Sequence, residues 1–174
     1  MFVDVSVLSK DSIKIKGRSS SFVIDPTAQI QEVGADAAVF LKDIENPEVG
    51  KVTDYRVIIK GAGEYEVAGT RILGTKSDDN FLYSFNIDNI SVFVARTSGL
   101  SKNQETGDYN ILILNVDCDF KDTMITGFSP SIVILFGEKA QEALKMLGKE
   151  SSKSQKFSIS ADKLPLEMQL VILS

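Results

Sequence analysis

Stretches in which apolar and polar side chains alternate recur along almost the whole chain. A period of two is typical of β-strands with one buried face, and these stretches are rich in Val, Ile and Phe, which favour strands. One run, over residues 37–41, is continuously apolar, as in a strand that is buried on both faces. The pattern predicts strands over residues 2–8, 12–16, 21–24, 37–41, 55–59, 65–67, 70–73, 81–87, 90–95, 109–115, 131–136, 156–160 and 168–173.

Helical periodicity is convincing in one segment, residues 138–149, where apolar side chains recur every three or four positions. Gly148 is placed to end this helix in a left-handed conformation. Residues 148–155 are rich in Ser and Lys and predict an exposed loop, and residues 101–107 form a weaker polar stretch. Neither stretch is long enough to separate two domains, so we expect residues 1–174 to form a single domain.

Turn residues connect the predicted strands. Asp88-Asn89 lies between two alternating stretches, and this pair strongly favours a two-residue hairpin turn. Many short strands combined with one clear helix predict a two-sheet sandwich with few helices, in the α/β (α+β) class.

Composition and charge narrow the possible functions. The chain has 174 residues, of which 43% are hydrophobic and 25% charged, as expected for a folded domain. The net charge of −5 argues against a surface that binds nucleic acid or an anionic membrane. The first residues lack the apolar core of a signal peptide, and no apolar run approaches the roughly 20 residues that cross a bilayer. A single cysteine, Cys118, fits a reducing compartment, so we expect a cytoplasmic protein.

The absence of histidine from the sequence restricts the chemistry most. Without imidazole the chain cannot use Ser-His-Asp or Cys-His catalysis, nor any zinc site that needs histidine ligands. Cys118 has acidic neighbours in the sequence, which disfavour a thiolate, so we interpret it as an unreactive residue at a strand end.

Residues 61–69 read GAGEYEVAG. This segment resembles the G-P-G-E-Y-E-V-x-G segment of a bacterial branch of the metallo-β-lactamase fold, whose members are described as zinc-dependent hydrolases. Residues 21–26 (SFVIDP) are similar to the family's opening strands, which end in Asp-Pro, and residues 164–167 (LPLE) are similar to its usual C-terminus. The resemblance covers nearly the whole chain. It implies an αββα sandwich, here strand-rich with reduced helices, and a di-metal hydrolase site at one edge of the sheets.

The ligands implied by that resemblance are missing. The family's H-x-H-x-D-H motif follows the apolar run, and its other ligands follow two later strands. The positions that match the motif are Lys42, Asp43, Ile44, Asn46 and Pro47, and those that match the later ligands are Val94, Thr97 and Gly137. In this set only Asp43 keeps the family's residue type. Zinc hydroxide chemistry needs donors that these side chains do not supply.

We therefore expect a catalytically inactive relative, a pseudoenzyme without a cofactor, that acts as a binding or interaction module. Two alternatives stay open. The first is a divergent hydrolase acting on esters, lactones or phosphodiesters, whose metal is held by carboxylates drawn from Asp25, Asp43, Glu45, Asp78 and Asp79. The second is a small anion- or metabolite-binding domain.

The alternative of an anion-binding domain depends on two cations near the predicted site. Lys42 and Arg96 could form an anion-binding pocket, or they could replace the lost metal charge by pairing with Asp43, Glu45 or Asp25. Ordinary solvated loop charge is the simpler interpretation.

Two further expectations concern surfaces. Glu64 and Glu66 share one face of a predicted strand, and we assign them a structural role, with Tyr65 pointing into the core. Reduced helical layers leave sheet faces or edges uncovered, and self-association is one way to protect them. A homo-oligomer is therefore expected, and an unidentified protein partner is possible.

Overall fold

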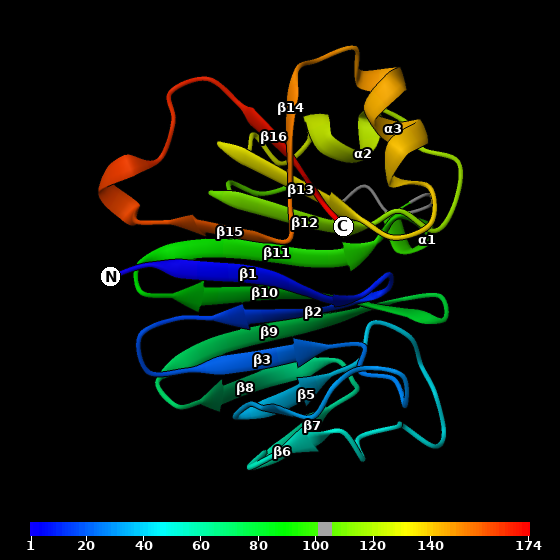
Figure 1. The fold of residues 1–174 in the computed structure, drawn as a ribbon, viewed down its shortest axis with the longest axis vertical. Coiled ribbons are helices and arrows are strands. Elements are labelled where there is room, and N and C mark those ends of the chain that lie inside the picture. The colour runs from blue at the N-terminus through cyan, green and yellow to red at the C-terminus, as the bar shows by residue number, and fades with distance from the viewer. Residues whose placement is uncertain (101–105) are drawn as a thin grey trace.

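The computed structural model describes residues 1–100 and 106–174 and contains two large β-sheets that pack face to face (Figure 1). The first sheet has six strands, and its spatial order differs from the order in the chain. From one edge to the other its strands are β15 (Lys156–Ile159), β1 (Val3–Ser9), β2 (Ser12–Lys16), β3 (Ser21–Ile24), β5 (Ala37–Val39) and β7 (Val57–Ile59). β3, β5 and β7 run parallel to one another.

The second sheet has eight strands and is half antiparallel, half parallel. In spatial order its strands are β14 (Ser151–Ser154), β16 (Gln169–Leu173), β13 (Ile132–Phe136), β12 (Ile111–Asn115), β11 (Ile90–Arg96), β10 (Asn80–Ile87), β9 (Thr70–Ser77) and β8 (Gly63–Val67). Neighbouring strands from β11 to β14 are parallel, whereas β8, β9, β10 and β11 are antiparallel. A separate small sheet pairs β4 (Val33–Gly34) with β6 (Val52–Thr53).

The two larger apolar clusters of the described residues lie on the two faces of the eight-stranded sheet. Alternate residues of both large sheets meet in the inner core, where Phe22 packs edge-on against Phe85 with ring centroids 5.1 Å apart. A second core lies on the outer face of β11, β12 and β13. There Leu112 and Leu135 are covered by side chains from the helices, including Met124 and Ala143. The helices are α1 (Thr97–Leu100), α2 (Thr123–Thr126) and α3 (Ala140–Leu147).

Most of the predicted elements are confirmed. Every strand predicted from the alternation overlaps an observed strand, and the predicted helix is α3, which ends at Gly148 in the left-handed region with φ 59°. Asp88 and Asn89 have φ angles of 49° and 64°, as a two-residue hairpin turn with two left-handed residues requires. The strand-rich two-sheet sandwich is the predicted fold class.

The prediction of a loop over residues 148–155 was wrong. Residues Ser151–Ser154 form β14, which pairs parallel with β16 at the edge of the eight-stranded sheet. Its side chains are exposed or half-buried, so the strand is held by backbone hydrogen bonds and shows no apolar alternation.

Short elements were also missed. They are β4, β6, α1, α2 and the 3₁₀ turn Ala161–Lys163, and each has at most four described residues. At such lengths a segment is too short to show a period in the sequence. Part of the polar stretch at residues 101–107 lies outside the described residues. In the part of the chain that is described, no helix is long and apolar enough to span a bilayer.

Candidate functional site at the carboxyl edge

The carboxyl ends of parallel strands from both sheets meet at one edge of the sandwich, which we call the carboxyl edge. In the eight-stranded sheet β11, β12 and β13 end in register at Arg96, Asn115 and Phe136. In the six-stranded sheet β3 is followed at once by Asp25. Because side chains that follow parallel strands converge, this edge is where an α/β sheet usually places a ligand.

Arg96 bridges the two sheets at this edge. Its Nε and Nη2 donate to Asp25 Oδ2 at 3.2 and 2.9 Å, and its Nη1 lies 3.7 Å from Asp117 Oδ2. The side chains of Arg96, Asp25 and Asp117 are 16%, 10% and 18% exposed. We call these three residues the Arg96 network. Because it is largely shielded from water, its charges depend on one another far more than surface charges do.

Asp25 is held in a fixed orientation. Its backbone is left-handed, with φ 49°, and its Oδ1 accepts a hydrogen bond of 2.9 Å from the Leu41 backbone N–H. Burial raises the pKa of the Asp25 carboxyl above its ordinary value, while the Arg96 guanidinium and the Leu41 hydrogen bond act in the opposite direction. The carboxylate form of Asp25 therefore depends on Arg96.

Asp117 anchors the start of α1. Its carboxylate accepts hydrogen bonds from the Ser98 backbone N–H at 2.9 Å, the Ser98 hydroxyl at 2.7 Å and the Thr97 hydroxyl at 3.1 Å. Thr97 Oγ1 in turn accepts from the Asp117 backbone N–H at 3.2 Å and from Cys118 Sγ at 3.3 Å. The oxygens of Asp117 therefore already have protein donors.

Gly137, where the resemblance expects the family's last histidine, has no room for a side chain. Its φ is 96°, and a Cβ built on it would overlap Asn115 Oδ1 and lie 3.2 Å from the Val116 backbone nitrogen. Asn115 is fully buried, and its amide donates to Asp11 Oδ1 at 3.3 Å. The Asn115 side chain therefore occupies space that a ligand at position 137 would need.

The other positions from the resemblance do not converge either. Val94 is fully buried in the inner core, and Ile44 packs against a separate apolar cluster that includes Val23 and Phe40. Asn46 is exposed and Pro47 is half-buried in the segment after β5. Of the positions from the resemblance, Thr97 alone contacts the Arg96 network, through its hydrogen bonds with Asp117.

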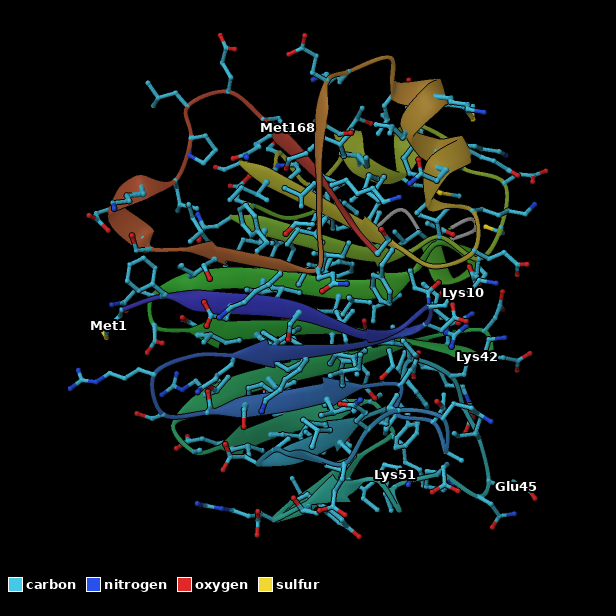
Figure 2. The ribbon with its side chains drawn as sticks, viewed as in Figure 1. Met1, Lys10, Lys42, Glu45, Lys51 and Met168 are labelled. Atoms are coloured by element: carbon cyan, nitrogen blue, oxygen red, sulfur yellow. The ribbon has the colours of Figure 1, made fainter. Side chains whose placement is uncertain are left out.

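Lys42 and Asp43 lie on an exposed segment beside β10. Lys42 forms an isolated antiparallel bridge with Asn80, and the Asp43 carboxylate pairs with Lys76 at 2.9 Å. Lys42 and Glu45 lie along the right-hand side of the molecule in Figure 2. No ion pair between Lys42 and a carboxylate is found within residues 1–100 and 106–174. Of the expected pairings, the structure contains Arg96 with Asp25. A pocket shared by Lys42 and Arg96 stays a prediction, and the guanidinium it would use is already paired.

The residues present do not fit the metal centre that the resemblance implies. Among the described residues no three His, Cys, Asp or Glu side chains are grouped so that they could hold an ion. Of the carboxylates considered as alternative ligands, Asp25 pairs with Arg96 and Asp43 with Lys76. Asp11, Asn115 and Asp117 were not singled out from the sequence. Their positions at or near strand ends were the available signal, since Asp11 lies between β1 and β2, Asn115 ends β12 and Asp117 follows two residues later.

Comparisons with known proteins agree with the architecture. No protein-family model and no curated protein matches the sequence. Among solved structures, a "putative zn-dependent hydrolase of the metallo-beta-lactamase superfamily" from Thermotoga maritima matches with a TM-score of 0.76 and 16% identity over 98% of both chains.

Two further structures have the same arrangement. The metallo-beta-lactamase fold protein YhfI from Bacillus subtilis matches with a TM-score of 0.54 and 10% identity, over 98% of this chain and 95% of YhfI. Igni18, a metallo hydrolase from Ignicoccus hospitalis, matches with a TM-score of 0.55 and 9% identity, over 92% of this chain and 99% of Igni18. At these identities the likeness concerns the fold, and the chain therefore has the metallo-β-lactamase fold.

Proposed function

We propose that this chain is a pseudoenzyme that uses the metallo-β-lactamase fold as a binding or interaction module and does not hydrolyse substrates through a zinc centre. The observation that carries the proposal is the Arg96 network. It places a guanidinium between Asp25 and Asp117 at the edge where the resemblance expects metal ions. A buried arginine can balance carboxylates there without a metal ion.

Displacing that guanidinium would be costly. A metal ion could use Asp25 only by breaking its contacts with Arg96, which would leave a largely buried cation unpaired. Breaking a buried ion pair costs about 3–5 kcal/mol. Zinc also prefers imidazole and thiolate ligands, and the sequence has no histidine and one cysteine. The donors that remain are too few to offset the loss.

The binding role is supported by the uncovered part of the eight-stranded sheet. The second apolar core and its helices cover β11, β12 and β13, whereas β8 and β9 carry exposed side chains on their outer face. Leu73 on β9 is 47% exposed. A face of this kind suits contact with another macromolecule. The homo-oligomer expected from the sequence is a separate part of this proposal, and this face is not assigned to it.

Metal analysis and activity assays on the purified protein test the proposal together. We expect less than stoichiometric metal by elemental analysis, no binding heat on titration with zinc, manganese or magnesium, and no turnover of ester, lactone or phosphodiester substrates with any of these ions. Stoichiometric metal together with turnover that a chelator abolishes would show a divergent metal hydrolase and refute the proposal.

A further inference from the structure

Strand β8 is an open edge of the eight-stranded sheet. It pairs antiparallel with β9 and is the last strand in the spatial order of the sheet as described. β7, the strand before it in the chain, is in turn an edge of the six-stranded sheet, so both sheets end on the same side of the sandwich (Figure 1). An edge strand presents backbone N–H and C=O groups that can pair with an added strand.

The side chains of β8 divide by charge between its two faces. Glu64 and Glu66 are exposed on the outer face, at positions i and i+2. Tyr65 lies on the opposite face, half-buried against the inner core, and its hydroxyl donates to the Gly61 carbonyl at 2.9 Å. A strand added beside β8 would therefore meet two carboxylates on one face and an aromatic ring on the other.

The outer face beside β8 is also hollowed. A surface pocket of about 610 Å³ extends over β8, β9 and β10. Leu73 lies opposite Glu64 in the register with β9, and Arg71 lies opposite Glu66. Its lining includes Glu64, Glu66, Arg71, Leu73, Ser84 and Asn86. Long side chains of an added strand could extend over Leu73 into this space.

A second copy of β8 is a poor occupant of this edge. Consider an antiparallel pairing of two copies that joins at least three residues of each strand and keeps both outer faces on one side. Each such register places at least one glutamate opposite another, either Glu64 opposite Glu66, Glu64 opposite Glu64 or Glu66 opposite Glu66. Like charges directly opposite each other destabilise a strand pair. The two glutamates therefore oppose self-pairing and favour a partner of opposite charge.

We infer that β8 pairs with an extended segment of another protein that carries Lys or Arg at alternate positions and apolar residues between them. The basic side chains lie opposite Glu64 and Glu66, the aliphatic stem of the one opposite Glu64 extends toward Leu73, and the apolar side chains cover Tyr65. Backbone hydrogen bonds to the open edge hold the segment, and its charge pattern selects it. This inference names a partner class for the binding role proposed above and rests on that role.

Peptide binding tests the inference. The probe is an acetylated and amidated peptide of about nine residues in which Lys and Val alternate, labelled with a fluorophore and followed by anisotropy at low salt. We expect saturable binding to the wild-type chain, and no saturation with a peptide in which Glu replaces Lys. Two N-methylated peptides separate strand pairing from charge attraction. Methylation of alternate amides that face β8 must abolish binding, whereas methylation of the other set must not.

A charge reversal on the protein locates the site. Glu64→Lys with Glu66→Lys must weaken the affinity for the Lys-Val peptide at least about tenfold. The matched control is Glu150→Lys with Glu167→Lys, which changes the net charge equally at exposed positions away from β8 and must leave the affinity unchanged. Circular dichroism of both variants establishes that they are folded.

The inference would be overturned if binding of the Lys-Val peptide did not saturate at about 1 mM, or if the control variant lost as much affinity as the β8 variant. It would also be overturned if neither N-methylation changed the affinity, or if the wild-type chain formed a dimer that buries β8. All peptide measurements are made without added metal. If the chain hydrolyses substrates with zinc but still binds the peptide through β8, the proposed function alone is refuted. If the chain holds no metal and does not bind the peptide, this inference alone is refuted.

Discussion

The carboxyl edge and the β8 edge place their charges in opposite ways. At the carboxyl edge the Arg96 guanidinium is largely buried and shared by two aspartates, so the charges there are satisfied within the chain. At the β8 edge Glu64 and Glu66 are exposed beside an uncovered strand. In a fold usually associated with a metal centre, the edge where a metal is expected is thus closed by internal contacts. The β8 edge, at the end of the eight-stranded sheet, offers backbone groups and two carboxylates. The difference is why the proposed binding role is assigned to the β8 edge, where backbone groups and charges lack partners in the described structure.

Replacing Arg96 should produce the largest effect, because it removes the partner of a buried carboxylate. Arg96→Met is expected to lower the free energy of unfolding by about 3–5 kcal/mol. The control is Lys76→Met, which breaks the exposed pair with Asp43 and should cost at most about 1 kcal/mol. Urea denaturation of both variants measures the difference. Equal losses would mean that the Arg96 network contributes no more than a surface pair.

Adding one methyl group at Gly137 tests whether the Asn115 side chain fills the position where the resemblance expects a ligand. Gly137→Ala combines a left-handed backbone with overlap against Asn115, and we expect a loss of about 3 kcal/mol. Gly69→Ala is the matched control, because its φ is 81° but nothing lies within 4 Å of the added Cβ. It should cost about 1–2 kcal/mol from backbone strain alone. If thermal or urea unfolding gave the two variants the same loss of stability, the Asn115 side chain would be able to move aside for a side chain at position 137.

The pH dependence of the Arg96→Met variant sharpens the same contrast. Burial already raises the pKa of Asp25, and loss of the guanidinium should raise it further. A carboxyl whose folded pKa exceeds its unfolded value stabilises the fold fully below the unfolded pKa and loses that stabilisation as the pH rises through the folded pKa. The cost of Arg96→Met should therefore be small below about pH 4 and grow toward neutral pH. Urea denaturation at several pH values measures it, and a cost that is constant with pH would contradict the role of Asp25.

The two edges also differ in how far the sequence predicts them. Period-two alternation located the large sheets, because one-sided burial determines which residues a strand carries. It missed β14, whose Ser and Lys side chains face solvent, since an edge strand held by its backbone needs no apolar pattern. The resemblance pointed to the carboxyl edge through positions such as Lys42 and Gly137.

The contacts that close the carboxyl edge could not be predicted from spacing. Asp25 and Arg96 are 71 residues apart in the chain, and Asn115 and Asp11 are 104 apart. Which of several turn carboxylates meets Arg96 depends on the packing of the two sheets. Glu64 and Glu66 were correctly placed together on one face of a strand, but that β8 is an edge follows only from the sheet order.

The smallest expected effect concerns self-association through β8. Replacing both glutamates by threonine keeps good strand-forming residues and removes the like-charge contacts that oppose self-pairing. Glu64→Thr with Glu66→Thr should leave the free energy of unfolding nearly unchanged and strengthen any self-association about tenfold, which sedimentation equilibrium measures. Glu150→Thr with Glu167→Thr, which removes the same charge at other exposed positions, should not change the association constant. If both pairs of substitutions strengthen association equally, net charge rather than the β8 edge controls it. If neither does, backbone pairing at β8 is blocked for a reason other than its glutamates.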